Sequence, residues 1–593
     1  MNKLIVPEHE LLAECRDIRP AVHDPMAIER LGRRVSKAIA AGRFADIKVR
    51  VAVLSSFLTD MLADSLVALL LARGIAAEIV RGPYGMIATD LLSTQSIARD
   101  CDMVIILPTH RDLAFAPRPG CSRLEADAAV EREAALWIDL WSRITKPVIQ
   151  LSFDPPPFRG LSEGDGFQPG GLLRHVRCVN QRLAEQAPAN LNLVDAEALT
   201  ARVGAEWHDA RTYHLCKQPF ASSAIPEVAE TLAAAAAGGL GKARKVLVLD
   251  LDNTVWGGVV GDVGLQGIVL GNETAEGEAF VGIQAYAKTL AARGIILAVC
   301  SKNNDAVARE PFRNHSGMVL KEEDVACFVA NFDDKVTNLQ RIAKTLNVGL
   351  DALVFVDDNP VERAWVRRQL PEVLVVDLPE DPALYAAAIE QTKAFPTSRL
   401  TGEDIARNAS YRARASVIEA QGSATDMDSF LEGLLPVAHV ERVSNASCDR
   451  IVQLVAKTNQ FKLNPTLFSH EEISAAGEGV LAIRFCDRLQ DYGIVAVAVV
   501  AIETSDAVIR NWVMSCRVFS RRLEHVTLEL IRNFATTRGA TRIRAPFKLS
   551  AKNAVARDAL TELGFTVDDM GNLIAPAEPV QTPVRHFIRL ENV

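Results

Sequence analysis

The chain has 593 residues, of which 49% are hydrophobic and 23% are charged, and its formal net charge at pH 7 is −9. This is the composition of a folded protein with several domains, and its acidic charge disfavours nucleic acid as a partner. The longest apolar run, residues 494–502, is too short to span a membrane, and the N-terminus lacks the apolar core of a signal peptide. Ten cysteines without a Cys-x-x-Cys pair predict a cytoplasmic protein with reduced thiols.

The first 240 residues alternate strand-like apolar runs with helical ones. The run VRVAVLSS leads into a leucine-rich helix, and the further strand candidates are AAEIV, DMVIILP, PVIQLSF and NLNLVD. This alternation predicts an α/β domain with a mostly parallel sheet over residues 1–240. An alanine-rich helix end that runs into glycines, residues 231–245, marks the domain boundary.

Residues 241–395 continue the α/β pattern with the runs KVLVLDLD, GIILAVCSKN and DALVFVDDNP. Continuous apolar runs are typical of strands that are buried on both faces of a parallel sheet, and ligands bind at the carboxyl ends of such strands. The polar residues 396–420 are predicted to form a linker helix. In residues 421–593, the runs GVLAIRFCD, GIVAVAVVAI and AVIRNWVMS predict adjacent antiparallel strands before the helix HVTLELIRNFATTRGAT, which together indicate an α+β domain.

The strongest chemical signal is the pair Asp250 and Asp252 at the end of KVLVL. Residues two apart on an extended segment face the same way, so both carboxylates can address one substrate. Carboxylate oxygens suit Mg²⁺, Asp250 can attack phosphorus, and Asp252 can serve as general acid and then as base. Taken alone, such a pair is also explained by chance or by helix capping.

Three more polar clusters follow in a fixed order. Ser301 lies 51 residues after Asp250, Lys335 lies 34 residues further on, and Asp357-Asp358 closes the run VFVDDNP 22 residues after Lys335. A serine hydroxyl can donate to a phosphoryl oxygen, and a lysine can neutralise the charge of nucleophile and phosphate together. The joint pattern indicates a phosphoryl-transfer site.

This order, Asp-x-Asp-x-Thr followed by Ser, Lys and Asp-Asp, resembles the haloacid dehalogenase (HAD) superfamily of phosphoryl-transfer enzymes. The resemblance implies a HAD-like Rossmannoid parallel sheet at the centre of a multidomain α/β chain. It implies that Asp250 is the nucleophile, that Asp252 is the acid and base, and that Thr254 supports their loop. It also implies that Ser301 and Lys335 hold the phosphoryl group.

The same resemblance implies a bound Mg²⁺ ion. Its ligands would be Asp250, the backbone carbonyl of Asp252, and Asp358 with Asp357 beside it. Residues 255–271, VWGGVVGDVGLQGIVLG, read as a glycine-rich hairpin and leave no room for a large cap domain. An open site suits a bulky or protein-borne substrate.

The segments DLDNTVWGGVVGD, CSKNN and VFVDDNPVERAWVR are similar to the FkbH-like subgroup of the HAD superfamily. This resemblance implies that a glyceryl unit from 1,3-bisphosphoglycerate is loaded onto an acyl carrier protein and dephosphorylated, for polyketide-type or tetronate biosynthesis. The accepting thiol would be the phosphopantetheine arm of the carrier, or first an enzyme cysteine such as Cys300. Two alternatives stay open: a HAD phosphatase that acts on another phosphomonoester or phosphoprotein without a carrier, and a non-catalytic scaffold that binds carriers.

The C-terminal segments RFCDRLQDYGIVAVAVV, WVMSCRVFSRRLE, KLSAKNAV and LGF resemble the GNAT acyltransferase fold. In that fold a glycine-containing turn binds a pyrophosphate at a helix N-terminus. Here Ser520 and Arg522 fill the glycine positions, which hinders close backbone approach. We therefore predict that Arg517, Arg521 and Arg522 bind the phosphopantetheine phosphate or the carrier surface, against the alternative of a structural arginine cluster. Cys516 is a further candidate nucleophile.

The N-terminal region resembles the SGNH-hydrolase fold, which carries a nucleophilic serine after its first strand. Here the strand ends in Ser55-Ser56 without the usual glycine and aspartate. Asp209 and His214 are candidate partners, but they lack the Asp-x-x-His spacing. A degenerate domain for packing or carrier recognition is the favoured interpretation.

Overall fold

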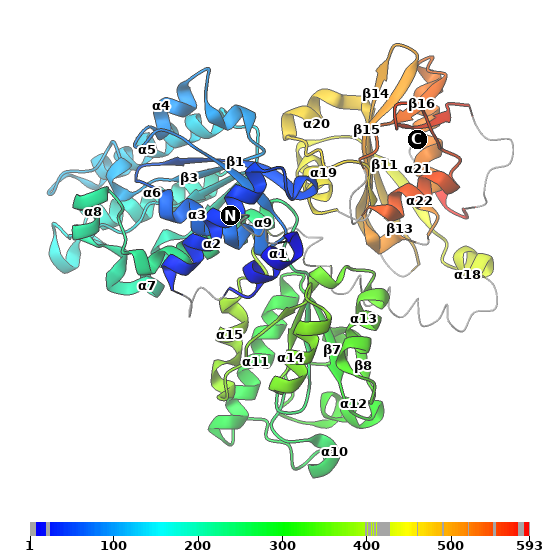
Figure 1. Cartoon of the computed structure of the whole chain (residues 1–593), viewed down its shortest axis with the longest axis horizontal. Helices are drawn as coiled ribbons and strands as arrows, with labels where there is room; N and C mark the ends of the chain where they lie inside the picture. Colours follow the sequence, from blue (N-terminus) through cyan, green and yellow to red (C-terminus); the bar gives the residue numbers. More distant parts are fainter. Residues whose placement is uncertain are drawn as a thin grey trace, which may run out of the picture. The chain divides into compact units, whose positions relative to one another are not determined.

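The computed structural model describes residues 7–18, 24–397, 427–458, 461–488, 491–519, 521–548, 553–578 and 586–591, together with Leu400, Ile405, Arg407 and Tyr411. The chain forms two compact units, one of residues 1–242 with 396–399 and the other of residues 243–395 with 400–593 (Figure 1). The first unit contains one sheet, and the second contains two. The predicted linker, residues 396–420, lies mostly outside the described residues.

The sheet of the first unit has the strand order β2-β1-β3-β4-β5, and all its neighbouring strands are parallel. Its strands are β1 (Lys48–Ser55), β2 (Ala76–Arg81), β3 (Met103–Leu107), β4 (Val148–Leu151) and β5 (Leu191–Val194). They coincide with the five runs from which a parallel α/β domain was predicted.

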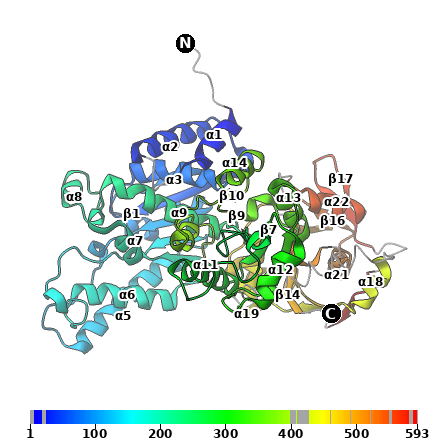
Figure 2. The same ribbon diagram turned by 90° about the horizontal axis from the view of Figure 1, so that it is seen from below.

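Helices cover both faces of this sheet. Alternate residues of β1 point to opposite sides because successive side chains in a strand alternate. Val51 and Val53 pack with α3 (Asp60–Ala72) and α9 (Ile225–Gly239), whereas Ala52 and Leu54 pack with helices of the other face. Those helices are α5 (Arg123–Ser142) and α6 (Leu172–Gln186). Figure 2 shows α2 (Pro25–Ala40) and α3 on one side of β1, with α5 and α6 on the other.

The sheet of residues 243–395 has the order β10-β9-β6-β7-β8 and is also entirely parallel. Its strands are β6 (Val246–Leu249), β7 (Ile296–Ser301), β8 (Val325–Ala330), β9 (Leu353–Val356) and β10 (Leu374–Val375). The strands β6, β7 and β9 were predicted from their apolar runs, whereas β8 and the two-residue β10 were not.

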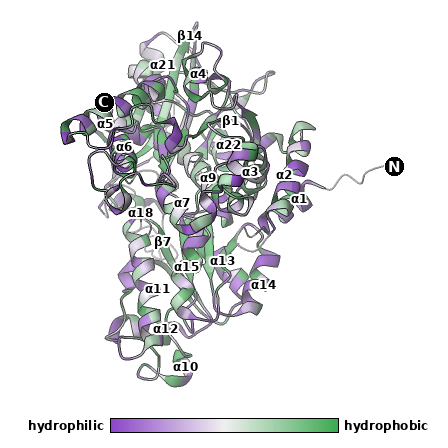
Figure 3. Ribbon diagram, turned by 90° about the vertical axis from the view of Figure 1, so that its left-hand side faces the viewer, coloured by the Kyte–Doolittle hydropathy of each residue, from purple (hydrophilic) through white to green (hydrophobic). Residues whose placement is uncertain are grey.

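Both faces of this second sheet are buried, which explains the continuous apolar runs. Leu247 and Leu249 pack into a core with α11 (Ala275–Ala292) and α12 (Asp305–Asn314). Val246 and Val248 pack on the opposite face with α13 (Lys335–Leu346) and α14 (Pro360–Gln369). In Figure 3 the strands are coloured predominantly as hydrophobic, whereas a helix such as α2 carries both colours. Because β6, β7 and β9 are parallel neighbours, their carboxyl ends meet at one edge of the sheet.

The segment between β6 and α11 is small, as predicted, but it is not a regular hairpin. One antiparallel bridge joins Gly257 to Val269, and the one-turn helix α10 (Val260–Val263) lies between them. The turn ends at Gly264, whose φ of 68° favours glycine. No large cap domain intervenes.

The third sheet, in residues 427–593, is mixed and mostly antiparallel. Its order is β17-β18-β16-β15-β14-β13-β11-β19, and β12 pairs with β15. The predicted neighbours β13 (Val480–Cys486), β14 (Asp491–Glu503) and β15 (Asp506–Met514) are antiparallel, and the predicted helix is α21 (Leu523–Thr537). The other strands are β11 (Val437–Glu441), β12 (Phe461–Lys462), β16 (Arg542–Ala545), β17 (Thr566–Val567), β18 (Leu573–Pro576) and β19 (Arg589–Glu591).

The structure describes nine further α-helices. They are α1 (Glu8–Arg16), α4 (Ile87–Leu92), α7 (Ala196–Val203), α8 (Ala210–Cys216), α15 (Tyr385–Gln391), α18 (Met427–Gly433), α19 (Asn445–Lys457), α20 (His470–Ala476) and α22 (Ala554–Glu562). Among all the helices described, none combines the length and the apolar character needed to cross a bilayer.

Candidate active site

The predicted phosphoryl-transfer residues meet at the carboxyl edge of the sheet β10-β9-β6-β7-β8. They surround a cavity of about 170 Å³. Its lining residues are Asp250, Asp252, Asn253, Ser301, Lys302, Lys335, Asp357, Asp358, Asn359 and Glu362. Every residue predicted for this site except Thr254, which stands behind it, lines this one cavity.

Local helix caps fix two sides of the cavity. The Asp334 side chain accepts a hydrogen bond from the backbone N–H of Thr337, which starts α13 and makes Lys335 its first residue. The Asn359 side chain caps α14 in the same way, and Pro360 occupies the first helical position, where its missing N–H costs nothing. The Asp-Asp-Asn-Pro sequence thus ends a strand, forms a turn and begins a helix within a few residues.

Lys335 is the central cation of the cavity, and its side chain is only 2% exposed. Its Nζ lies 2.7 Å from Asp250 Oδ1 and 3.2 Å from Asp357 Oδ2, and it donates a 2.7 Å hydrogen bond to the carbonyl of Cys300. Burial alone would lower the pKa of Lys335, but the charges of Asp250 and Asp357 raise this pKa well above its ordinary value. Lys335 is therefore a permanent positive charge beside the carboxylate of Asp250.

Three carboxylates crowd together on the same side of the cavity. One oxygen from each of Asp250, Asp357 and Asp358 lies within 4.8 Å of the other two. Burial and the charge of Asp250 raise the pKa of Asp357 to about 6, and the same two causes raise the pKa of Asp358. Asp250 Oδ1 and Asp357 Oδ2 are buried without a hydrogen bond, since Lys335 approaches them closely but outside hydrogen-bond geometry. One lysine does not balance three carboxylates, and this all-oxygen donor set fits a hard divalent cation such as Mg²⁺.

Asp252 lines the same cavity, but other groups of the chain occupy both of its carboxylate oxygens. Its Oδ1 accepts hydrogen bonds from Trp256 Nε1 at 2.9 Å and from the backbone N–H of Val260 at 3.1 Å. Its Oδ2 accepts from Asn303 Nδ2 at 3.1 Å. Burial raises the pKa of Asp252, as an acid and base requires. Its carboxylate is thus not a member of the metal-type cluster, which leaves the backbone carbonyl for the predicted metal role.

Thr254 and Ser301 occupy the positions that the sequence predicts. The backbone N–H of Asp358 donates to Thr254 Oγ1 at 3.1 Å, so Thr254 holds the loop after β9 against the loop after β6. Ser301 is 1% exposed and lines the cavity at the end of β7. Sequence reasoning missed Asn303, although it stands two residues after Ser301 in the quoted run CSKNN.

Cys300 does not have the surroundings of a nucleophile. Its side chain is fully buried in the core beneath the sheet, and burial raises the pKa of its thiol to about 12. A thiol in this state behaves as a small hydrophobic side chain. The structure thus disfavours the predicted alternative of an acyl-Cys300 intermediate.

The arginines before α21 are engaged inside their own domain. Arg521 is 4% exposed, with Nη2 3.4 Å from Asp487 Oδ2 and hydrogen-bonded to the Tyr492 hydroxyl at 3.3 Å. Arg517 is also buried, and Arg522 pairs with Asp428 at 2.7 Å. Two of the three predicted phosphate ligands are thus buried, which favours the alternative of a structural arginine cluster. Nothing is described of the Cys516 side chain or of Ser520.

The predicted serine, aspartate and histidine of the N-terminal domain do not come together. Ser56 Oγ donates to Asp112 at 2.6 Å, and Ser55 Oγ accepts from the backbone N–H of Phe57. Asp209 caps α8, and His214 is exposed on that helix. These contacts do not form a serine-hydrolase triad, in line with the favoured interpretation of a degenerate domain.

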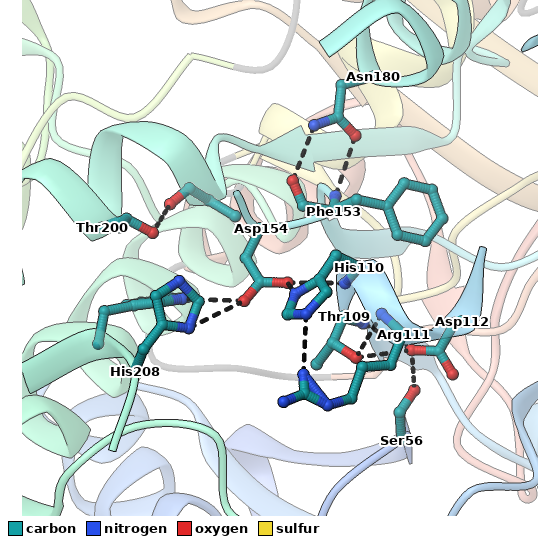
Figure 4. Close-up of polar contacts among 12 residues, drawn as sticks. Ser56, Thr109, His110, Arg111, Asp112, Phe153, Asp154, Asn180, Thr200 and His208 are labelled. Atoms are coloured by element: carbon teal, nitrogen blue, oxygen red, sulfur yellow. Dashed lines mark hydrogen bonds and ion pairs between the residues drawn. The ribbon is translucent and has the colours of Figure 1, made fainter. Parts of the chain in front are cut away.

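A different polar cluster occupies the carboxyl edge of the N-terminal sheet, around His110 and Asp154 (Figure 4). Sequence reasoning missed both residues. Their only signal is that each follows a predicted strand, in the segments PTHRD and SFDPPP.

No protein-family model and no curated protein matches this chain. Among solved structures, the N-terminal part of the protein BF1531 from Bacteroides fragilis, which contains a phosphatase domain and was solved in complex with Mg, is 30% identical to this chain. The match has a TM-score of 0.58 and covers 62% of this chain and 99% of that one. This chain belongs to the same family as that protein, and it contains a HAD-type phosphatase domain.

Two acetyltransferase structures match a quarter of the chain. They are the ribosomal-protein-S18-alanine N-acetyltransferase from Escherichia coli, 13% identical, and yncA from Salmonella typhimurium, a putative acetyltransferase solved with acetyl-CoA, 15% identical. Each match covers 25% of this chain and nearly all of the other, with a TM-score of 0.19. Scores this low leave the GNAT-like fold a prediction, and the SGNH-like fold also stays a prediction.

Proposed function

We propose that this protein is a Mg²⁺-dependent phosphoryl-transfer enzyme in which Asp250 is the nucleophile. The observation that carries the proposal is the single cavity where Asp250, Lys335, Ser301 and the carboxylates of Asp357 and Asp358 meet. Asp250, Asp358 and the backbone carbonyl of Asp252 would hold the metal, with Asp357 beside them. The ion would neutralise charge on the phosphoryl oxygens.

The reaction proceeds in two steps at this cavity. A carboxylate oxygen of Asp250 attacks phosphorus, and the bond from phosphorus to the leaving oxygen breaks with its electron pair. Asp252 gives its proton to that leaving oxygen. Asp252 then takes a proton from the water that attacks the aspartyl-phosphate, which releases phosphate and restores Asp250. Lys335 and Ser301 hold the phosphoryl oxygens in both steps.

The size of the cavity supports a substrate whose bulk stays outside. A volume of about 170 Å³ is below the roughly 300–1,000 Å³ typical of small-molecule pockets, so it suits a phosphoryl group and little more. The segment between β6 and α11 carries only the one-turn helix α10 and no large cap domain. Together with the resemblance to the FkbH-like subgroup, this supports 1,3-bisphosphoglycerate as donor and the phosphopantetheine arm of an acyl carrier protein as acceptor. The product would be a dephosphorylated glyceryl thioester for polyketide-type biosynthesis.

The test is intact-protein mass spectrometry of a phosphopantetheinylated carrier incubated with this protein, Mg²⁺ and enzymatically generated 1,3-bisphosphoglycerate. Asp250→Asn should abolish the dephosphorylated glyceryl adduct. The matched control Asp262→Asn, an exposed aspartate on α10, should not. Phosphate release from small phosphomonoesters without any adduct would reduce the proposal to a plain phosphatase. If neither the adduct nor free phosphate forms, the proposal is contradicted entirely.

A further inference from the structure

The strand order of the N-terminal sheet marks a place where a ligand would bind. In open parallel sheets, ligands bind at the carboxyl ends of the strands where the strand order reverses. In the order β2-β1-β3-β4-β5 this point lies between β1 and β3. Ser56 follows β1, His110 follows β3 and Asp154 follows β4, and their side chains gather at this edge (Figure 4). The same rule locates the phosphoryl-transfer cavity, since Asp250 follows β6 and Asp357 follows the reversed neighbour β9.

Asp154 fixes the orientation of His110. The Asp154 side chain is 1% exposed, and its Oδ1 lies 2.9 Å from His110 Nδ1 and accepts the backbone N–H of His110 at 2.7 Å. Its Oδ2 accepts from Trp207 Nε1 at 3.1 Å. Burial alone would raise the pKa of Asp154, but its hydrogen bonds with His110 and with Trp207 hold this pKa below the ordinary value. A buried, ionised carboxylate therefore faces one nitrogen of the imidazole.

Arg111 decides which nitrogen of His110 carries the hydrogen. Its Nη1 lies 2.8 Å from His110 Nε2. A guanidinium only donates, so Nε2 must accept with its lone pair, and the hydrogen resides on Nδ1 facing Asp154. This is the tautomer in which an imidazole can take a proton at Nε2 while an aspartate holds its other side.

Arg111 is also free to bind an anion. It is exposed, and its recorded partners are neutral: His110 and the ring of Tyr213, whose centroid lies 4.2 Å from the Arg111 Cζ. Within the described residues no carboxylate lies at ion-pair distance from it, whereas the exposed Arg177 of the same domain pairs with Glu197 at 2.5 Å. A phosphate would be a better partner for this guanidinium than an imidazole lone pair. Such an exchange would uncover Nε2 of His110.

We propose that His110 and Arg111 form a second site, in which His110 is the general base for a thiol that attacks an acyl phosphate and Arg111 binds the phosphate of that donor. This inference rests on the proposed function, which requires a thioester-forming step and assigns it no residues. The thiol proton moves to His110 Nε2, and the sulfur forms a bond to the acyl carbon. The bond from that carbon to the phosphate oxygen breaks, and phosphate leaves with the electron pair. His110 then returns its proton to solvent.

Ser56 does not compete as the nucleophile. Its hydroxyl donates to Asp112 Oδ2, which also accepts the backbone N–H of Thr109 at 2.6 Å. Ser56 and Asp112 thus tie the loops after β1 and β3 together. The nucleophile must come from the substrate, which suits the thiol of a carrier arm.

The test compares His110→Gln with His208→Gln in the full chain. His208 is the matched control because its Nδ1 lies 4.0 Å from Asp154 Oδ2 and its ring centroid lies 6.0 Å from that of His110. Thioester formation on the phosphopantetheinylated carrier from 1,3-bisphosphoglycerate is followed by intact-protein mass spectrometry over about pH 6 to 9. Hydrolysis of p-nitrophenyl phosphate at the Asp250 cavity is measured in parallel and reports whether the phosphatase domain is intact.

His110→Gln should slow thioester formation about 100-fold near pH 6.5, and the deficit should shrink about tenfold per pH unit up to the thiol pKa near 8.5, because solution then supplies the thiolate. His208→Gln should stay within about threefold of wild type. Arg111→Gln should raise the half-saturating donor concentration about tenfold, at the scale of one lost charge-assisted hydrogen bond. All three variants should hydrolyse p-nitrophenyl phosphate normally.

Three results would overturn this inference in distinguishable ways. Wild-type transfer that His110→Gln leaves unchanged at every pH would refute the second site and leave the proposed function standing. Wild-type protein that hydrolyses p-nitrophenyl phosphate but never acylates the carrier would remove the transfer step and this site with it. If His110→Gln loses both activities through misfolding, the exposed Arg111→Gln decides, and an unchanged half-saturating donor concentration would refute the site.

Discussion

Replacing Lys335 by methionine should destabilise the phosphatase domain and abolish its activity together. The lysine is 2% exposed and is the cation that contacts both Asp250 and Asp357. Removal of one partner from a buried ion pair costs about 3–5 kcal/mol, because the remaining charges lose their compensation. For a domain of this size each kcal/mol lowers the melting temperature by about 2–4 °C, so the domain transition should fall by about 6 °C or more. Hydrolysis should fall at least about 100-fold, since the charge beside the phosphoryl group is gone.

Differential scanning calorimetry measures this loss, with p-nitrophenyl phosphate hydrolysis on the same samples. The chain has more than one domain, so the shift must be read from the transition that Mg²⁺ also moves. Lys344→Met is the matched control: it lies on the same helix α13, is exposed, and should change the free energy of unfolding by less than about 0.5 kcal/mol. A Lys335→Met protein that melts like wild type would refute the argument that this lysine compensates buried charge.

Three further predictions concern Asp357, Arg521 and Cys300. Mg²⁺ should raise the melting temperature more at about pH 7.5 than at about pH 5.5. The pKa of Asp357 in the folded protein, about 6, lies above its unfolded value, so protonation stabilises the metal-free fold at low pH and this contribution is lost as the pH rises through 6. The cation, in contrast, needs the ionised form of Asp357. Scanning fluorimetry at both pH values checks this, and an equal shift would contradict it. Arg521→Met should cost about 3–5 kcal/mol because the buried carboxylate of Asp487 loses the charge of Arg521, while phosphomonoester hydrolysis stays normal. A normal melting temperature with lost carrier acylation would instead restore the phosphate-binding prediction. Cys300→Ala should keep carrier acylation within about threefold of wild type, as measured by mass spectrometry, because a buried thiol with a pKa of about 12 supplies no thiolate. Loss of acylation by a stable variant would instead support an acyl-cysteine intermediate.

The sequence predicted which residues meet in the Asp250 cavity because its signals are local. Asp250 and Asp252 belong to one strand end, and Ser301 and Asp357 each close an apolar run that is buried on both faces. Such runs are visible without knowledge of the partners of each strand. The strand β10 escaped prediction because two residues are too few to form a pattern.

Contacts between distant segments were not predictable in this way. The ion pair of Arg521 with Asp487 joins the segment before α21 to the segment between β13 and β14, and nothing near Arg521 in the sequence indicates that it is buried. An arginine beside a helix start is equally compatible with an exposed phosphate ligand. Its burial follows from the three-dimensional packing, so only the structure could distinguish a phosphate ligand from a structural arginine.

The same limit explains why His110 and Asp154 were missed while Asp250 and Asp357 were found. Both pairs stand at the carboxyl edge of a parallel sheet, at or beside the point where the strand order reverses, but the strand order is set by which strands pair and is not visible in any local pattern. The central pair was found because a family motif supplied the missing order. The N-terminal pair has no motif, and its 44-residue separation becomes a 2.9 Å contact only once β3 and β4 are known to be neighbours. Where no motif exists, polar residues that directly follow apolar runs become stronger candidates for a site when several of them can lie at the same edge of one sheet.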